Sequence, residues 1–289
     1  MKNFNFLEPK NLPEAVDLLS QFGDRAKILA GGTDLLVQMK KGKVRPENLI
    51  NLKKVSGLNQ VEYTPAGLKV GSLVSIGRLA QEAIIREKYP VLAQAAAVLG
   101  SPQVRSRATV GGNLSNASPA ADTAPALLVY QAQVRVAGAA GERLIALEDF
   151  FQAPGKTSLQ SGEILTGVEI PAPLPGTGAV YIKHGRRKGH EIAMVGVCAL
   201  INLEPGTGKI AQARIALGAV APTPLRAKAA EEILAGQLPD PTLLEKAANL
   251  ATEAATPISD IRSSAEYRKL LVQVLTLRAL QQAVSIAAK

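Results

Sequence analysis

Apolar residues repeat at helical spacing near the start of the chain. They recur every three or four positions, the period of one helix face, at Leu12, Ala15, Val16, Leu19 and Phe22. Pro13 suits a first helical turn and Gly23 suits the end of a helix. The pattern therefore predicts a helix over residues 11–23.

Two short apolar runs flank the next predicted helix. Residues 27–30 and 49–52 have the length and composition of buried strands, and residues 35–40 have the pattern of a short helix. The order strand, turn, helix, strand is completed within about thirty residues. This order indicates a small α/β unit at the start of the chain.

The middle of the chain alternates strands, helices and one long loop. Ser75 suits the N-cap of a helix with apolar residues between 76 and 84. Pro90 interrupts this helix, and residues 91–99 resume as an alanine-rich helix. Residues 109–125 are rich in Gly, Ser, Asn, Ala and Pro but almost uncharged, which predicts an irregular loop that is buried. Strands are expected at 67–74, 133–137, 143–147 and 163–170.

Residues 171–178, with three prolines and two glycines, are the clearest linker signal in the chain. Beyond them, strands are expected at 179–184, 192–203 and 210–219, a hairpin turn at 204–208, and helices from about residues 225, 241 and 264. Strands followed by helices indicate an α+β second domain. The expected domains are residues 1–175, with subdomains of about 1–55 and 56–175, and residues 178–289.

The net charge of +9, from 33 Lys and Arg against 24 Asp and Glu, suits nucleic acid, an anionic membrane or an anionic ligand. Aromatic residues make up only 3% and Trp is absent, so few rings could stack on bases. The basic residues are scattered, and the densest cluster is Arg186, Arg187 and Lys188. Nucleic-acid binding is therefore disfavoured.

Cys198 is the single cysteine, which excludes a disulfide, an iron–sulfur cluster or a cysteine zinc site within this chain. It lies in the apolar run 192–201, which predicts a buried side chain and is too short for a membrane span. His184 and His190 are the only histidines, and both suit surface positions better than a metal site or a triad. The start of the chain lacks the apolar stretch of a signal peptide, so a cytoplasmic protein is expected.

Two Gly-Gly turns, eighty positions apart, are the strongest candidates for chemistry, because the dinucleotide fingerprint and the nucleophile elbow are absent. The first turn leads from the strand 27–30 into the helix 35–40. Backbone N–H groups at Gly31 and Gly32 could bind a phosphate, and Thr33 could donate its hydroxyl. The structural alternative is a tight turn in which Thr33 or Asp34 caps the helix.

The second turn lies in residues 109–122, where Gly111 and Gly112 are followed by small hydrogen-bonding side chains. The alternative here is a structural loop whose Asn and Ser side chains cap its own backbone. Two anion cradles in one domain would suit a ligand with two linked phosphates, as in FAD.

Residues 30–36 and 109–113, with Ser-Pro-Ala-Ala-Asp at 118–122, resemble the FAD-binding medium subunit of the molybdenum hydroxylases, a group that includes bacterial xanthine and carbon monoxide dehydrogenases. The resemblance continues through residues 162–165, 183–187, 219–227 and 264–268 and so covers essentially the whole chain. It implies an α+β protein with a vanillyl-alcohol-oxidase-type FAD-binding fold. Two N-terminal α/β subdomains would hold FAD between them, and the C-terminal α+β domain, an antiparallel sheet with helices, would cover the flavin.

The resemblance also implies the cofactor contacts. The pyrophosphate would lie against the two glycine turns, Asp122 would bind polar FAD oxygens, and Lys183 would lie beside the cofactor. Ile192 falls near the ring face, where some members carry Tyr. The implied cofactor-binding residues are Leu29, Ala30, Gly31, Gly32, Thr33, Asp34, Leu35, Leu99, Thr109, Gly111, Gly112, Asn113, Ser118, Asp122, Leu165, Lys183 and Ile192.

Several of these positions have a structural alternative. Lys183 would otherwise belong to a solvated basic turn. Arg105 and Arg107 could meet a phosphate, but exposed salt bridges are the stronger expectation for them. Apolar side chains suit the core of any fold, which applies to Leu99, Leu165 and Ile192.

In this family the chain would be an oxidoreductase subunit with no catalytic residue and no metal ligand of its own. Electrons would pass from the [2Fe-2S] clusters of a small subunit through non-covalent FAD to NAD⁺, quinone or another acceptor, while a large subunit holds the molybdopterin. A hetero-oligomer without nucleic acid or a membrane span is expected. A free-standing flavin oxidoreductase of the same fold remains an alternative, as does a basic scaffold without flavin.

Overall fold

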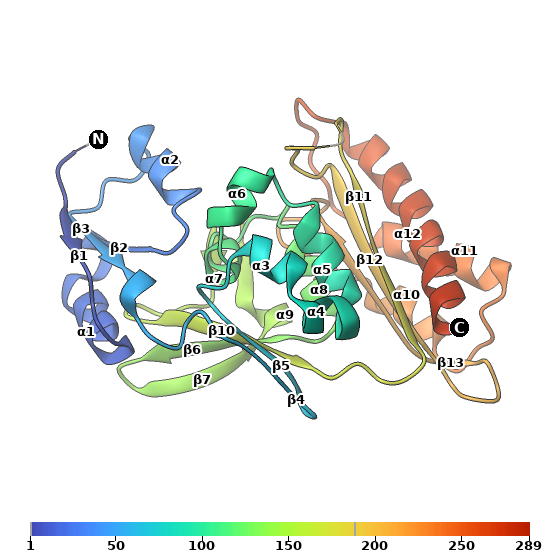
Figure 1. Ribbon diagram of the computed structural model, residues 1–289. Helices are drawn as coiled ribbons and strands as arrows, with labels where there is room; N and C mark the ends of the chain where they lie inside the picture. The colour runs from blue at the N-terminus through green and yellow to red at the C-terminus, as the bar shows by residue number, and fades with distance from the viewer. Residues whose placement is uncertain (1, 188) are drawn as a thin grey trace. The chain divides into compact units, whose positions relative to one another are not determined.

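The computed structural model describes residues 2–187 and 189–289, whose helices and strands are labelled in Figure 1. The chain divides into two compact units, each built from three stretches. The first unit comprises Met1–Leu79, Pro102–Ala117 and Ala132–Pro171. The second comprises Ala80–Ser101, Ser118–Gln131 and Ala172–Lys289. The expected sequence boundary near residues 175–178 stays a prediction, since units defined by spatial contacts need not follow the chain.

A three-stranded parallel sheet begins the first unit, in the order β1-β3-β2. Its elements are β1 (Asn5–Leu7), α1 (Leu12–Phe22), the 3₁₀ turn η1 (Gly23–Arg25), β2 (Ala26–Leu29), α2 (Leu35–Lys40), β3 (Asn48–Asn51) and the 3₁₀ turn η2 (Leu52–Lys54). The Asn11 side chain caps α1, Pro13 lies in its first turn and Gly23 ends it, as the sequence predicts.

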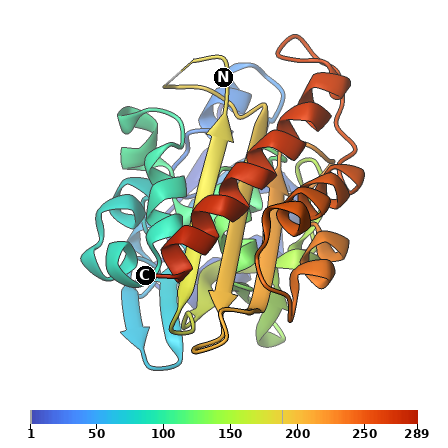
Figure 2. The same cartoon turned by 90° about the vertical axis from the view of Figure 1, so that its right-hand side faces the viewer.

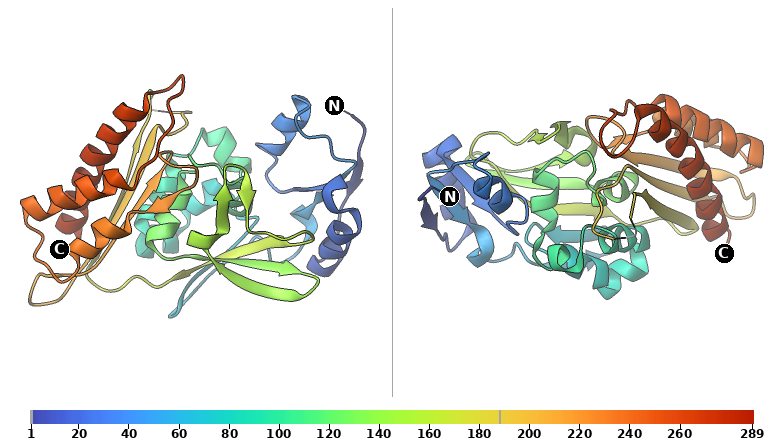
Figure 3. Two further views of the ribbon diagram at one scale, coloured as in Figure 1. Left: turned by 180° about the vertical axis from the view of Figure 1, so that it is seen from behind. Right: turned by 90° about the horizontal axis from the view of Figure 1, so that it is seen from above.

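Helices α1 and α2 cover opposite faces of this sheet, because neighbouring residues of a strand point to opposite sides. Leu49 of β3 packs with Met39 of α2, whereas Ile50 packs with Ala15 and Val16 of α1. Figure 3 shows α1 and α2 on the two sides of these strands. The predicted α/β unit is therefore present.

A five-stranded antiparallel sheet forms the rest of the first unit, in the order β4-β5-β10-β6-β7. Its strands are β4 (Val61–Thr64), β5 (Gly67–Gly71), β6 (Gln133–Gly138), β7 (Gly141–Ala146) and β10 (Ile164–Pro171). A small hairpin, β8 (Phe151–Ala153) with β9 (Lys156–Thr157), follows the short helix α9 (Leu147–Phe150).

Short helices occupy the middle of the chain. They are α3 (Ile76–Gln81), α4 (Ala83–Lys88), α5 (Pro90–Ala97), α6 (Pro102–Arg107), α7 (Val110–Ser115) and α8 (Thr123–Val129). The single helix predicted between Ser75 and Pro90 breaks at Glu82, whose ψ of 123° is extended. The prediction of an irregular loop over residues 109–125 was wrong in part, because α7 and the start of α8 lie within it. Its predicted burial is confirmed for α8, every residue of which is buried.

A four-stranded antiparallel sheet organises the second unit, in the order β11-β12-β13-β14. Its strands are β11 (Thr177–His184), β12 (Val195–Leu203), β13 (Ile210–Gly218) and β14 (Leu225–Arg226). Three helices follow: α10 (Lys228–Leu234), α11 (Pro241–Glu253) and α12 (Ala265–Ala287). This is the predicted α+β domain, and Figure 2 shows α12 lying across the sheet.

Alternate residues of β12 face the two sides of this sheet. Val195, Val197, Ala199 and Ile201 join the core formed with α10–α12. Cys198 points to the other side and is fully buried, as predicted. Burial raises the pKa of its thiol far above the usual range, so this thiol stays protonated at neutral pH.

Among the described residues, α12 is the one helix long and apolar enough to cross a membrane: it has 23 residues, and an 18-residue stretch of it has a mean hydropathy of 1.4. Leu271, Val272, Leu275 and Ala279 recur on one face and lie in the core beneath the sheet. Packing against β12 and its neighbours accounts for these apolar residues of α12.

A buried arginine ties the start of α12 to the strands. Arg268 is 1% exposed and donates hydrogen bonds to the carbonyl oxygens of Met194 and Ala219, at 3.1 and 2.9 Å. It also donates to the Asp260 carboxylate at 2.8 Å, and Arg262 pairs with the same carboxylate. Arg268 therefore ties α12 to the residue that follows β13, and Asp260 ties the loop before α12 to Arg268.

We expect Asp260→Asn to lower the free energy of unfolding by about 1–3 kcal/mol at pH 7. Arg262, helped by Arg268, holds the pKa of the Asp260 carboxyl well below its usual range. A lowered folded-state pKa contributes stability that is present above the unfolded value of about 3.9 and lost as pH falls through the folded value. The difference in the free energy of unfolding between wild type and the variant, measured by urea unfolding, should therefore become smaller as the pH falls from 5 to 3. A deficit that stays constant over this range would contradict the assignment.

Candidate functional site

The first glycine turn connects β2 to α2 in a conformation that only small residues allow. Gly32 has a φ of +77°, in the left-handed region that favours glycine. A Cβ atom at Gly31 would lie 2.2 Å from the carbonyl oxygen of Arg107 and 2.9 Å from the Cα of Ala108. The turn therefore requires glycine at both positions, for different reasons.

Backbone N–H groups of this turn have no acceptor in the part of the chain that the structure describes. The N–H groups of Gly32, Thr33, Asp34 and Leu35 donate to none of residues 2–187 and 189–289. Asp34 occupies the N-cap position of α2, as the structural alternative predicts, but its side chain makes no capping hydrogen bond. The hydroxyl of Thr33 donates to the Asp34 carboxylate at 3.3 Å. Consecutive unpaired N–H groups make a concave binding site for an anion.

The second glycine turn uses its N–H groups differently. Gly111 donates to the carbonyl oxygen of Ser72 at 2.8 Å, and Gly112 donates to the Thr109 hydroxyl at 3.1 Å. A Cβ atom at Gly111 would lie 2.6 Å from the Ser72 Cβ. Gly111 is required for this close approach. The second predicted anion cradle therefore differs from expectation, because both glycine N–H groups already bond to the protein.

The fold brings the two turns side by side within the first unit. Gly31 touches the backbone of residues 107–108, immediately before Thr109. A Cβ atom on Gly112 would lie 3.9 Å from the Cβ of Ala30. The bridge between Ser75 and Thr109 and the hydrogen bond from Ile76 N–H to Ala108 O hold the second turn in place. Two motifs eighty positions apart in the sequence are thus neighbours in the fold.

A buried cluster of polar side chains lies in the second unit. Asp122 is 5% exposed, and its two carboxylate oxygens accept hydrogen bonds from the Tyr181 hydroxyl and the Lys183 ammonium, each at 2.8 Å. Lys183 also donates to the carbonyl oxygen of Val98 at 3.0 Å. Each side chain therefore has a partner in this cluster.

Burial is the largest influence on the Asp122 carboxyl and raises its pKa, while Lys183 and Tyr181 offset part of that effect. Burial, together with the neighbouring carboxylate, raises the pKa of the Tyr181 hydroxyl well above its usual value. Tyr181 therefore stays protonated and donates its hydrogen bond at any physiological pH.

Comparison of the sequence with known protein families shows which family the chain belongs to. Residues 2–173 match the model described as "FAD binding domain in molybdopterin dehydrogenase". The chain belongs to the FAD-binding medium subunits of the molybdenum hydroxylases. Residues 180–283 of this medium subunit match the "CO dehydrogenase flavoprotein C-terminal domain".

Whole-length relatives agree with this family. The medium subunit is 32% identical over 281 residues to the carbon monoxide dehydrogenase medium chain of Afipia carboxidovorans, covering 97% of this chain and 96% of the relative. It is 31% identical over 278 residues to the xanthine dehydrogenase FAD-binding subunit of Escherichia coli O157:H7, covering 96% and 94%. It is thus an oxidoreductase subunit of the carbon monoxide and xanthine dehydrogenase type.

Solved structures confirm the predicted fold. A chain of the carbon monoxide dehydrogenase from Hydrogenophaga pseudoflava superposes with a TM-score of 0.95 at 32% identity, covering 99% of this medium subunit and 98% of that chain. A chain of quinoline 2-oxidoreductase from Pseudomonas putida 86 gives 0.93 at 32% identity, with 100% of both chains covered. The α+β FAD-binding fold, with its C-terminal antiparallel sheet and helices, is therefore established.

The predicted apolar contacts differ in burial. Leu99 and Leu165 are 9% and 5% exposed, as the core alternative requires. Ile192, in contrast, is 59% exposed, so the expectation that it would suit the core was wrong. This exposed apolar side chain is available to a ligand, and the predicted contact of Ile192 with the flavin stays a prediction.

Two of the predicted cations do not have the purely structural roles that the sequence left open for them. Lys183 is no solvated turn residue, because its side chain is only 11% exposed and pairs with Asp122. Arg107 is exposed but makes no ion pair with any described residue, so the expected salt bridge was wrong there. His190 is exposed and His184 half-buried. Lys188 of the predicted basic cluster lies outside the described residues.

Sequence reasoning missed Tyr181. The signal was present, because Tyr181 and Lys183 are two apart on a strand and therefore share a face. Pairing them with Asp122, fifty-nine positions away, required the tertiary structure. Among residues 2–187 and 189–289, no cluster of three or more His, Cys, Asp or Glu side chains could hold a metal ion.

Proposed function

We propose that this medium subunit carries electrons from [2Fe-2S] clusters in a partner subunit, through non-covalent FAD, to NAD⁺, a quinone or another acceptor. The molybdopterin and the clusters would lie only in the partner subunits, and the assembly would be cytoplasmic. When bound, FAD supplies the redox chemistry, and this chain binds and orients it.

One observation carries the proposal. The N–H groups of residues 32–35 are unpaired among the described residues, at a turn where Gly31 leaves room for no side chain. This donor set fits a phosphate of the FAD pyrophosphate. Arg107 adds an exposed cation without an ion-pair partner in the described chain, and its backbone touches Gly31.

The proposed roles of the other residues follow from their surroundings. Thr109 and Gly112 shape the surface beside the first turn, and the Asn113 side chain follows them in α7. In the second unit, Tyr181 and Lys183 hold the Asp122 carboxylate in one orientation. A carboxylate held in this way can still accept hydrogen bonds from ribityl or ribose hydroxyls, because each oxygen has a second lone pair.

The experiment is an absorbance spectrum of the purified full chain, followed by acid release and identification of the flavin. Flavin bands near 370 and 450 nm, with FAD in the released fraction at about one per chain, are expected. Tagged chain should also co-purify with subunits that contain iron and molybdenum. A protein that stays colourless after incubation with FAD would refute the proposal. FAD-loaded chain that oxidises a substrate of its own without partners, with the electrons reducing the FAD, would favour a free-standing oxidoreductase.

A further inference from the structure

A concentrated group of cations lies at the end of α2 in the first unit. Residues 35–46 contain no Asp or Glu. Four cations fall within the last seven of these positions, and Lys2 lines a cavity with two of them. We call the five side chains the basic surface: Lys2, Lys40, Lys41, Lys43 and Arg45.

The backbone beneath the basic surface is tightly defined. Gly42 has a φ of +70° and donates to Met39 O at 3.1 Å, while the N–H of Lys43 donates to Gln38 O at 3.0 Å. These two bonds close the end of α2 as a Schellman motif. Arg45 is anchored in turn, since its Nε donates to Gly42 O at 3.1 Å. The cations are thus presented on a fixed loop.

The basic surface has no counter-ions in its own chain. None of its five cations forms an ion pair with a residue in the described ranges, and all five are exposed. The neighbouring carboxylate of Glu47 pairs with Arg25 at 3.7 Å instead. Lys54, elsewhere in the same subdomain, pairs with Glu8 at 2.9 Å. Four like charges within six residues repel one another, and an acidic surface brought against them would relieve that repulsion.

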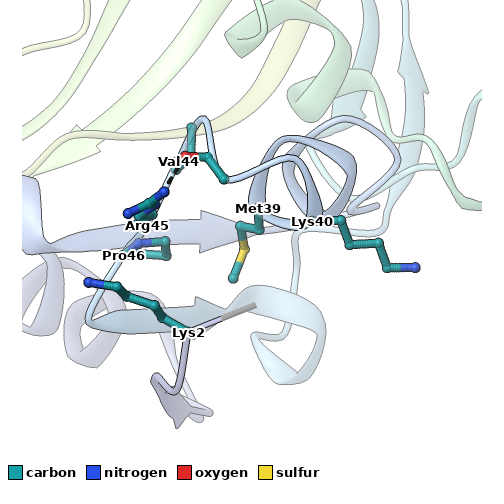
Figure 4. Close-up of a pocket in the computed structure, with 7 residues that line it drawn as sticks. Lys2, Met39, Lys40, Val44, Arg45 and Pro46 are labelled. Carbon is teal, nitrogen blue, oxygen red and sulfur yellow. Dashed lines mark hydrogen bonds between the residues drawn. The ribbon is translucent and has the colours of Figure 1, made fainter.

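An apolar floor lies among these cations. A cavity of about 300 Å³ is lined by Lys2, Met39, Lys40, Arg45 and Pro46, with Gly42 and Val44. Met39 is 4% exposed and Pro46 is buried. Figure 4 shows Lys40 on the opposite side of Met39 from Lys2 and Arg45. An apolar centre with a charged rim is the usual anatomy of a protein–protein interface.

We propose that the basic surface docks an acidic face of a partner subunit in the molybdenum hydroxylase complex. The inference rests on the proposed function, in which this chain works beside partner subunits. A nucleic acid fits less well, since the chain has only 3% aromatic residues and the cavity is lined by none. A protein partner uses both the cationic rim and the apolar floor, and the rim would speed and orient its association.

The test compares two charge-reversal variants of the full chain, each produced together with its cluster and molybdenum subunits. The first is K40E/K41E/K43E/R45E. The control reverses four exposed cations of the second unit that form no ion pair in the described chain: K209E/K246E/K269E/R278E. Each variant loses four positive charges and gains four negative ones, so both fall from +9 to +1 (9 − 8 = 1). Net charge is therefore matched.

Subunit association is measured by dilution of the complex at 50 and 500 mM NaCl, with FAD content recorded in parallel. The first variant should raise the Kd for the partner subunits about 10- to 100-fold at low salt, and less than about threefold at high salt, because salt screens exposed charges. The control should change the Kd less than about twofold.

Three results would overturn the proposal: an unchanged Kd in the first variant, an equal loss in both variants, or a loss that high salt does not reduce. Inorganic phosphate at 10 mM could instead raise the unfolding temperature of wild type and not that of the first variant. If subunit association is also unchanged in the first variant, the basic surface binds a small anion and not a partner subunit. Failure of the proposed function looks different, since wild type itself would then lack FAD or partner subunits.

Discussion

Replacing Gly31 by alanine is expected to abolish FAD binding by the medium subunit, raising the Kd at least about 100-fold. The new Cβ would lie 2.2 Å from Arg107 O and 2.9 Å from the Arg107 carbonyl carbon and the Ala108 Cα, all of which are backbone atoms. A side chain could rotate away, but this backbone cannot move without displacing Thr109 and the second glycine turn. We also expect a loss of about 1–3 kcal/mol in the free energy of unfolding, as for other overpacked sites.

Fluorescence titration of the flavin-free chain with FAD measures the first effect, and urea unfolding measures the second. Gly189→Ala is the control, because a Cβ there meets no atom within 4 Å. FAD affinity and unfolding midpoint should be unchanged in Gly189→Ala. Wild-type FAD affinity in Gly31→Ala would show that the contact between the two turns is not needed for the cofactor.

Replacing Lys183 by methionine should destabilise the medium subunit by about 3–5 kcal/mol at pH 7, since it leaves the buried Asp122 carboxylate without its counter-ion. Tyr181 still donates to Asp122, but a single neutral donor does not compensate a buried charge. Asp122→Asn in the same chain removes that charge, so the double variant should recover part of the loss. A coupling energy of about 1–3 kcal/mol is expected from the double-mutant cycle.

The loss in Lys183→Met should depend on pH. Burial already raises the pKa of Asp122, and removing the ammonium raises it further. When a folded-state pKa lies above the unfolded value of about 3.9, the folded chain holds the proton more tightly, and stability falls as pH rises through that window. The deficit should therefore be largest near pH 7 and smaller near pH 5, as measured by urea unfolding at each pH.

The exposed pair Arg25 and Glu47 provides the matched control, with side chains 61% and 65% exposed and 3.7 Å apart. Arg25→Met should change stability by less than about 1 kcal/mol at either pH. Titration with FAD separates two roles of Lys183. The double variant is compared with Asp122→Asn alone, because Asp122 is itself a proposed FAD contact. A structural role of Lys183 alone would give these two chains equal FAD affinity, whereas the proposed cofactor contact of Lys183 would make the affinity of the double variant lower.

Local sequence patterns predicted most of the helices and strands. Asn11, Pro13 and Gly23 predict the limits of α1 because capping and φ preferences act within a few residues. The same reasoning places α2 at Leu35–Lys40 and the start of α12 after Ser264. It failed at Glu82, where one predicted helix is broken into two, and in residues 109–125, where short helices form in place of the loop that glycine and proline favour.

The sequence predicted the motifs of the candidate site but not how their residues are arranged and bonded. The two glycine turns were identified from residue types, and their resemblance to the medium subunits led to the correct family. The bond from the Gly112 N–H to the Thr109 hydroxyl is a local N-cap, three residues apart. The sequence could not show that the Gly111 N–H donates to the carbonyl oxygen of Ser72, because that bond depends on which distant backbone comes close, and spacing along the chain does not record it.

The sequence by itself therefore determined the family, the fold class and the residue types of the FAD-binding turns, since these follow from local preferences and from the motifs. Only the tertiary structure decided which donors stay unpaired, that Gly31 abuts Arg107, and that Lys183 is held by Asp122. It also left Ile192 59% exposed within an apolar run of sequence. Burial, charge pairing and close approach are properties of long-range contacts, and these arise only when separate segments fold together.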